Sequence, residues 1–204
     1  MEPSGKGNGR TIRSKADYRY FCQCDTRAAK REGSYRKARF IARCSHNYEF
    51  LCTLALRKFE YILNCKKGPV GKIRLIFAKR KFYKYCAYAS VFAQPNTIGP
   101  GVYIPHGNAV ISGFAALGKN CMILSDVTIG VGREGDDAPT IGNNVYIGSG
   151  AKLIGGITIA DDVVIGANAV VVRDVTDKGV TVAGIPAKKI SSIGSEGMLV
   201  RAAD

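Results

Sequence analysis

An aliphatic residue returns at intervals of six through most of the segment between residues 98 and 171. The series runs Ile98, Ile104, Val110, Leu117, Ile123, Ile129, Ile141, Ile147, Leu153, Ile159, Ile165 and Val171, with one extra residue before Leu117 and two periods between Ile129 and Ile141. A second series four residues later, also expected to point inward, holds Val102, Asn108, Cys121, Val127, Val145, Ala151, Ile157, Val163, Ala169 and Val175. A repeat this short and this regular constrains the fold more than any other feature of the chain.

Six residues are enough for one short strand and one corner. Three such units close a coil of about eighteen residues, with aliphatic side chains stacked inside and residues such as Gly or Asn at the corners. An antiparallel meander would instead alternate apolar and polar residues at a period of two, with tight-turn dipeptides between strands. The chain is therefore predicted to be mainly β, with a parallel β-helix over residues 91–190.

The front half predicts α-helices. Apolar residues recur at spacings of three and four in 14–30, 34–65 and 72–84, and residues 66–71, which hold Gly68, Pro69 and Gly71, predict a turn. An uncovered first coil would expose aliphatic side chains and unpaired strand edges, so these helices are expected to cap it. The expected organisation is a disordered tail over 1–12, a basic α-helical region over 13–90, the β-helix, and a C-terminal tail over 191–204.

The positive charge belongs to the front half alone. Residues 1–90 hold 22 Lys and Arg against 6 Asp and Glu, whereas residues 91–204 hold 8 against 10. Such a surface suits nucleic acid, an anionic membrane or a phosphorylated substrate. Because no nucleic-acid-binding motif is recognisable, a nucleic-acid partner is not expected. Peripheral contact with an anionic membrane stays open, beside the alternative that the charges only solvate the helical cap.

Neither targeting nor metal binding has a signal in the sequence. The first fifteen residues hold no apolar stretch, and no apolar run approaches the roughly 20 residues that cross a bilayer, so a cytoplasmic, soluble protein is expected. Of the 7 cysteines only Cys22 and Cys24 lie close together. Reduced thiols and no metal site are therefore expected.

Six short stretches, taken in order, carry a family resemblance. They are IPHGN at 104–108, LSDVTIG at 124–130, PTIG at 139–142, VYIGSGAKLIGG at 145–156, IGANAVV at 165–171 and AGIPAK at 183–188. Together they closely resemble the serine acetyltransferase family of hexapeptide-repeat acyltransferases. The helical front half is similar, more loosely, to the serine-acetyltransferase-like O-acetyltransferases of surface-polysaccharide pathways. The resemblance implies a left-handed β-helix, a homotrimer, and acetyl-CoA bound between neighbouring subunits.

The resemblance assigns the catalytic histidine to His106, and the chemistry of the residue agrees. A hydroxyl is a poor nucleophile until a base removes its proton, and histidine is the side chain whose ordinary pKa lies near working pH. The imidazolium can then protonate the departing CoA thiolate. The alternative is a corner residue that only bonds to a neighbouring turn. His46, the other histidine, falls in the helical region without a motif.

The chain departs from the serine acetyltransferase pattern where that family grips its substrate. The family places an Asp before the catalytic His, and an Arg-His pair before the proline that ends the broken loop. The matching positions here are Pro105, Asp137 and Ala138, and the acid that orients the family's histidine aligns with Val91. The contacts to the amino and carboxylate groups of serine are therefore missing. The polar loop at 130–140 is either a ligand-binding loop or a surface insertion.

Stacking predicts substitutes for these groups. Neighbouring coils should place His106 over Ser125, at a strand separation of about 4.8 Å. Asn108, Ser125 and Asp126 are the candidates for orienting the imidazole or gripping the acceptor. Asn108 could equally be a core amide, and Asp126 a plain corner residue.

For acetyl-CoA, the resemblance implies backbone contacts near Ser149 and Ala167 for the pantetheine arm, and Gly130 near the thioester. Small residues suit a groove between coils, which a larger side chain would block. Lys188 and Lys189 are either partners of the CoA phosphates or a solvated end of the coil.

The leading hypothesis is an acetyl-CoA-dependent O-acetyltransferase that acts on a sugar hydroxyl of a polysaccharide or its precursor. Within the same family, the alternative is a serine O-acetyltransferase with an unusual amino-acid pocket. A third hypothesis, from a different class, is a non-catalytic trimeric β-helix scaffold.

Overall fold

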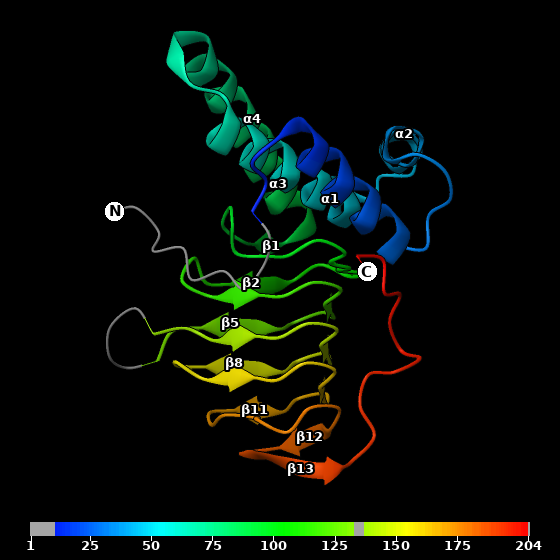
Figure 1. Ribbon diagram of the computed structural model, residues 1–204, viewed down its shortest axis with the longest axis vertical. Helices are drawn as coiled ribbons and strands as arrows, with labels where there is room; N and C mark the ends of the chain where they lie inside the picture. Colours follow the sequence, from blue (N-terminus) through cyan, green and yellow to red (C-terminus); the bar gives the residue numbers. More distant parts are fainter. Residues whose placement is uncertain (1–10, 133–136, 204) are drawn as a thin grey trace.

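The computed structural model describes residues 11–132 and 137–203, and places a helical region on one end of a column of coils (Figure 1). The helices are α1 (Lys15–Ala28), α2 (Tyr35–Cys44), α3 (Tyr48–Cys65) and α4 (Gly68–Ala89). The strands are β1 (Val91–Phe92), β2 (Ala109–Ile111), β3 (Ala116–Leu117), β4 (Met122–Ile123), β5 (Thr128–Gly130), β6 (Thr140–Ile141), β7 (Tyr146–Ile147), β8 (Lys152–Ile154), β9 (Thr158–Ile159), β10 (Val164–Ile165), β11 (Val170–Val171), β12 (Thr181–Gly184) and β13 (Ala187–Ser191). Most of the predicted disordered tail over 1–12 lies outside the described residues, but Ile12 is buried against Phe21 and belongs to the packed region.

Local capping decides where the helices begin. Ser14 and Asn47 accept hydrogen bonds from backbone N–H groups in the first turns of α1 and α3, as N-cap residues do. The predicted helical segment 34–65 is two helices, because the chain turns at His46, whose φ is 54°. The predicted turn at 66–71 is wrong from Gly68 onward: α4 starts there, and a proline in the first turn of a helix loses no intrahelical hydrogen bond.

The strands stack into three parallel sheets, one for each face of the coil. Their orders are β1-β2-β5-β8-β11, β4-β7-β10-β12-β13 and β3-β6-β9, and only the last pair, β12 and β13, is antiparallel. Ile141 pairs with Ile159, which is one coil of eighteen residues further along the chain. The predicted parallel β-helix with three six-residue units per coil is confirmed.

The predicted inward series is wrong at two positions. Val110 is 47% exposed, whereas Ile111 is fully buried and pairs with Ile129. Likewise Asn108 is exposed, and its neighbour Ala109 takes the inward position. The extra residue of the repeat therefore lies before Ile111 and not before Leu117, which means that it lengthens the turn containing His106.

The broken loop leaves the stacking intact. Ile129 pairs with Leu153 below it, and Leu117 pairs with Ile141 across the insertion. Residues 133–136, at the centre of this loop, lie outside the described residues.

Helices α3 and α4 cover the first coil, as expected of a cap. Phe59 of α3 and Phe82 of α4 are buried in the same apolar core as Ile98 and Ile104 of the coil. This core then continues through the stacked aliphatic residues of the β-helix to Val182. The helical region and the coils therefore share one hydrophobic core.

A buried arginine fastens the helices to this coil. Arg57 of α3 donates to the Asp25 carboxylate of α1 at 2.8 Å, and to the backbone carbonyls of Ile98 and Gly99 at 2.8 and 2.7 Å. Asp25 also accepts from the N–H of Gly101 at 2.8 Å. Burial alone would lower the pKa of Arg57, but the carboxylates of Asp25 and Glu60 outweigh it and raise this pKa, so the guanidinium stays charged.

One face of α4 has no partner among the residues that the structure describes. Ile73, Ile76 and Phe77, which the sequence places on one face, are all more than half exposed, and so is Val70 one turn earlier. The side of α4 that packs on the core carries Phe82, Cys86 and Ala89 instead. Among the described residues, no helix is both long and apolar enough to span a bilayer.

Candidate active site

His106 lies in a turn that is anchored to the end of α4. The N–H of Asn108 donates to the carbonyl oxygen of Ala89 at 3.2 Å, and Asn108 has a φ of 65°, in the left-handed region. Gly107 lies so close to α4 that a Cβ atom at this position would collide with the Ala89 carbonyl oxygen. The backbone of the turn that carries His106 is therefore held by the helical cap.

This turn borders a pocket of about 280 Å³. The pocket is lined by Ala28, Lys30, Gly101, Tyr103, Pro105, His106, Asn120, Cys121, Met122, Leu124, Met198, Leu199 and Val200. These residues come from the end of α1, from two neighbouring coils and from the C-terminal tail. Among them Lys30 carries an ammonium group, and there is no carboxylate side chain.

The C-terminal tail forms one wall of the pocket, which the sequence analysis missed. The tail returns along the coils toward α1 (Figure 1). There the N–H of Ala203 donates to the Asn120 side chain at 2.9 Å, and Arg201 pairs with Asp162 at 3.0 Å. The apolar run Met198–Val200 within the tail was the available signal.

The strand register aligns several predicted residues in one column. Tyr103 pairs with Met122, Met122 with Tyr146, and Tyr146 with Val164. Three residues after each of these stand His106, Ser125, Ser149 and Ala167, all at the corner between the sheets of β4 and β5. The turn of His106 is one residue longer than the next turn, so Asn108 and Asp126, both left-handed, occupy equivalent positions, and the stacking of His106 over Ser125 stays a prediction. The same corner of the coil carries both the histidine and the residues proposed for the pantetheine arm.

The candidates for orienting the imidazole make other contacts. Ser125 donates to the Ser149 hydroxyl at 3.4 Å, and Asp126 pairs with Lys152 at 3.4 Å. Asn108, predicted at an inward position, is exposed at the left-handed position of the turn. In the described part of the chain, no hydrogen bond joins any of the three to the His106 imidazole.

The remaining residues proposed for the cofactor lie at two other places. Gly130 ends β5, so the width of one sheet separates it from the column. Lys188 and Lys189 are exposed on β13, at the end of the coil, where Lys189 pairs with Asp177 at 2.9 Å. One chain therefore brings Ser149 and Ala167 into line with His106, but not Gly130.

The positions that depart from the serine acetyltransferase pattern cannot restore its contacts. Pro105 lies in the wall of the pocket, Val91 is buried in β1, and Asp137 is exposed beside the half-buried Ala138. None of them places an acid beside His106.

Cys121 also lines the pocket, and its thiol is protonated at neutral pH. Burial raises the pKa of this thiol to about 12, so it stays protonated. Among the described residues, no group of three or more His, Cys, Asp and Glu side chains could hold a metal ion.

Comparison with known proteins agrees with this geometry. The family model described as bacterial transferase hexapeptide (six repeats) matches residues 138–173. No curated protein sequence matches the chain. Among solved structures, the serine acetyltransferase of Neisseria gonorrhoeae is similar at 28% identity and a TM-score of 0.67, over 87% of this chain and 68% of that one.

Two further similar structures are also named serine acetyltransferases. The serine acetyltransferase of Brucella abortus strain S19 is 25% identical, with a TM-score of 0.66 over 87% of this chain and 68% of its own. That of Vibrio cholerae O1 biovar El Tor N16961 is 26% identical, with a TM-score of 0.65 over 87% and 67%. The predicted fold class, a left-handed parallel β-helix preceded by an α-helical region, is confirmed.

Proposed function

We propose that this chain, which belongs to the hexapeptide-repeat acetyltransferases, transfers the acetyl group of acetyl-CoA to a hydroxyl group, with His106 as the general base. The observation that carries the proposal is the place of His106: it borders the pocket and stands at the head of the column formed by Ser125, Ser149 and Ala167. An acceptor in the pocket and a donor along the column would meet at the imidazole.

The reaction needs two proton transfers, and one imidazole can perform both. His106 takes the proton of the acceptor hydroxyl as its oxygen attacks the thioester carbonyl carbon. The tetrahedral intermediate then collapses, the carbon–sulfur bond breaks, and the imidazolium gives its proton to the CoA thiolate. The products are the acetyl ester and free CoA, and the histidine returns to its neutral form.

The donor is proposed to lie along the column, with its arm against the backbone at Ser149 and Ala167. We propose that the exposed Lys188 and Lys189, at the far end of the coils, meet its phosphates. Gly130 stands at another corner, so its proposed contact with the thioester requires the groove to be shared with a second chain. A homotrimer with sites between subunits supplies that second edge.

Serine is the acceptor that the comparisons favour. The similar structures are named serine acetyltransferases. The sugar hydroxyl, which the sequence analysis put first, is less well supported by the comparisons than its serine alternative.

One observation favours a sugar hydroxyl as the second candidate. Free serine carries an ammonium and a carboxylate group, and burying each group needs an oppositely charged partner. Lys30 could meet the carboxylate, but the described lining of the pocket has no carboxylate for the ammonium group. A sugar hydroxyl needs neither.

The acceptor is tested by CoA release from acetyl-CoA with L-serine and with a panel of monosaccharides and oligosaccharides. Turnover with serine alone supports the first candidate, and turnover with a glycan but not with serine supports the second. Loss of all acceptor-dependent release would contradict the enzyme and support the scaffold hypothesis.

We also propose that the protein is cytoplasmic and that it makes peripheral contact with an anionic membrane. The second proposal is supported by the exposed face of α4, where Ile73 and Phe77 lie among Lys72, Arg74 and Arg80. Sedimentation with anionic and neutral vesicles tests it, because a Phe77→Ser variant should bind anionic vesicles more weakly. Equal binding of both proteins to both vesicles would contradict it.

A further inference from the structure

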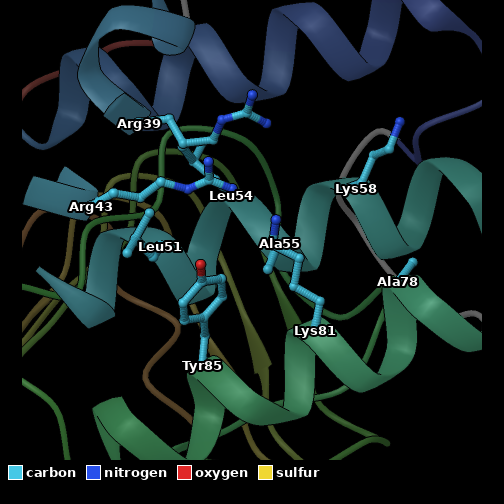
Figure 2. Close-up of a pocket in the computed structure, with 9 residues that line it drawn as sticks. All are labelled: Arg39, Arg43, Leu51, Leu54, Ala55, Lys58, Ala78, Lys81 and Tyr85. Carbon is cyan, nitrogen blue, oxygen red and sulfur yellow. The ribbon is translucent and has the colours of Figure 1, made fainter. Parts of the chain in front are cut away.

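A second cavity lies within the helical region, among α2, α3 and α4 (Figure 2). It has a volume of about 40 Å³ and is lined by Arg39, Arg43, Leu51, Leu54, Ala55, Lys58, Ala78, Lys81 and Tyr85. None of these residues lines the pocket at His106. The cavity therefore has no part in the proposed acetyl transfer.

All the charged groups around this cavity are positive. Arg39 and Arg43 extend over it from α2, while Lys81 and Tyr85 rise from α4 (Figure 2). Lys58 adds a fourth cation from α3. Within the described chain, none of the four cations forms an ion pair with a carboxylate, and no carboxylate lines the cavity.

The four charges act on one another. Burial lowers the pKa of Lys81, and the nearby charges of Arg43, Arg39 and Lys58 lower it further. Like charges held together without a counter-ion disfavour the charged forms, and an anion in the cavity would remove this repulsion. The site is therefore built for a negatively charged group.

The apolar part of the cavity lining limits which anions can bind well. Leu51, Leu54 and Ala55 of α3 and Ala78 of α4 offer no polar side-chain atom. A ligand must therefore supply by itself the acceptors for two guanidinium groups, two ammonium groups and the Tyr85 hydroxyl. A phosphate has more acceptor oxygens and more charge than a carboxylate, and planar guanidinium groups bind it in bidentate fashion.

A larger cavity next to this one has room for the rest of such a ligand. It measures about 480 Å³ and is lined by Lys15, Tyr18, Arg19, Tyr35, Arg36, Arg39, Lys58 and Tyr61. Arg39 and Lys58 border both cavities, so the two form a continuous cationic surface. Tyr18 and Tyr61 stack there with ring centroids 5.2 Å apart and offer an apolar wall.

We propose that the cavity among α2, α3 and α4 is a binding site for the phosphate or pyrophosphate group of a ligand. The group is presented either by a soluble molecule or by the headgroup of a membrane lipid. Its chemistry is the same in both cases, and the two sources are separated by experiment.

The test is isothermal titration of the full chain with inorganic pyrophosphate at constant ionic strength. We expect one saturable site per chain, and at least a ten-fold weaker affinity in each of the variants Lys81→Met and Arg43→Gln. The matched controls are Lys72→Met and Arg80→Gln, which remove the same charges from positions of α4 outside the cavity; all four side chains are exposed, so the controls differ from the lining variants in location alone. The controls should bind within two-fold of the wild type.

Two results would overturn the proposal. One is the absence of saturable pyrophosphate binding by the wild-type protein. The other is equal weakening in the lining variants and their controls, which would mean that only diffuse positive charge attracts the anion. A His106→Ala variant should bind pyrophosphate normally, and Lys81→Met should keep its acetyl transfer, so failure of this proposal is distinguishable from failure of the proposed function.

Vesicle flotation identifies the source of the phosphate. The vesicle control is Lys37→Met, which removes an exposed lysine of α2 outside both cavities. If a lipid presents the phosphate, vesicles containing phosphatidic acid should bind the wild-type protein, pyrophosphate should release it, and Lys81→Met should bind more weakly than Lys37→Met. If a soluble ligand presents it, Lys81→Met and Lys37→Met should bind these vesicles alike, while their affinities for pyrophosphate still differ. Either pattern supports the site.

Discussion

The N–H of Asn108 donates to the carbonyl oxygen of Ala89 at 3.2 Å, so the turn that carries His106 hangs from the last residue of α4. Ala89 itself is buried in the shared core of helices and coils. The helical region therefore does more than cover an open end of the solenoid, because it also fixes the position of the proposed base.

Substitutions at Asn108 should separate a backbone role from a chemical one. Asn108→Gly should keep near wild-type turnover, because glycine adopts a φ of 65° without strain and the Asn108 side chain is exposed. Asn108→Val should lower turnover, because a β-branched residue is strongly disfavoured in this region. Steady-state rates of CoA release measure both. A large loss of turnover in Asn108→Gly would mean that the amide itself serves the reaction.

Removing Arg57 should lower the stability of the protein, because Arg57 joins α1 and α3 to the first coil. Arg57→Met leaves Asp25 buried without its main partner, and breaking a buried pair in this way costs about 3–5 kcal/mol. Chemical denaturation of the variant measures the loss. Arg27→Met, which removes an exposed arginine of α1, is the control and should change stability little. A loss no larger than that of the control would contradict the clamp.

Acid should loosen the C-terminal tail at Asp162. Burial raises the pKa of this carboxyl, but the hydrogen bond from Asn144 and the charges of Lys178 and Arg201 outweigh it and lower the pKa below its ordinary value of 3.8. A lowered folded-state pKa gives stability that is present above 3.8 and is lost as the pH falls through the folded-state value. The difference in Tm between wild type and Asp162→Asn should therefore shrink from pH about 5 to pH about 3. A constant difference would contradict this.

The assembly should be a trimer or a multiple of one. Light scattering is expected to give three times 21.9 kDa, or a multiple of that value, at all working concentrations. A monodisperse monomer with full turnover would contradict a site that draws Gly130 and His106 from different chains.

The periodicity could predict the coil because each aliphatic side chain fills the same inward position in every turn, as at Ile123, Ile147 and Ile165. It failed at Val110 and Asn108 because one extra residue can be placed in either of two neighbouring turns. Only the contact of the His106 turn with Ala89, which is distant in sequence, decides between them.

The residues that line the pocket could not be predicted from the sequence, for the same reason. Met198 and Lys30 meet there because the tail folds back along the coils, and no local pattern encodes that path. The His106 assignment, in contrast, followed from a local motif at a predictable corner. Its chemical role, and those of Ser125, Asp126, Ser149 and Ala167, stay predictions.

The most direct test of the account is the rate of CoA release by His106→Ala with the acceptor that the wild type uses. We expect turnover to fall by about 10²- to 10⁴-fold, as on removal of a general base, while acetyl-CoA binding measured by titration stays near the wild-type value. His46→Ala, the matched control in the helical region, should keep full activity. Full turnover by a correctly folded His106→Ala trimer would contradict the account.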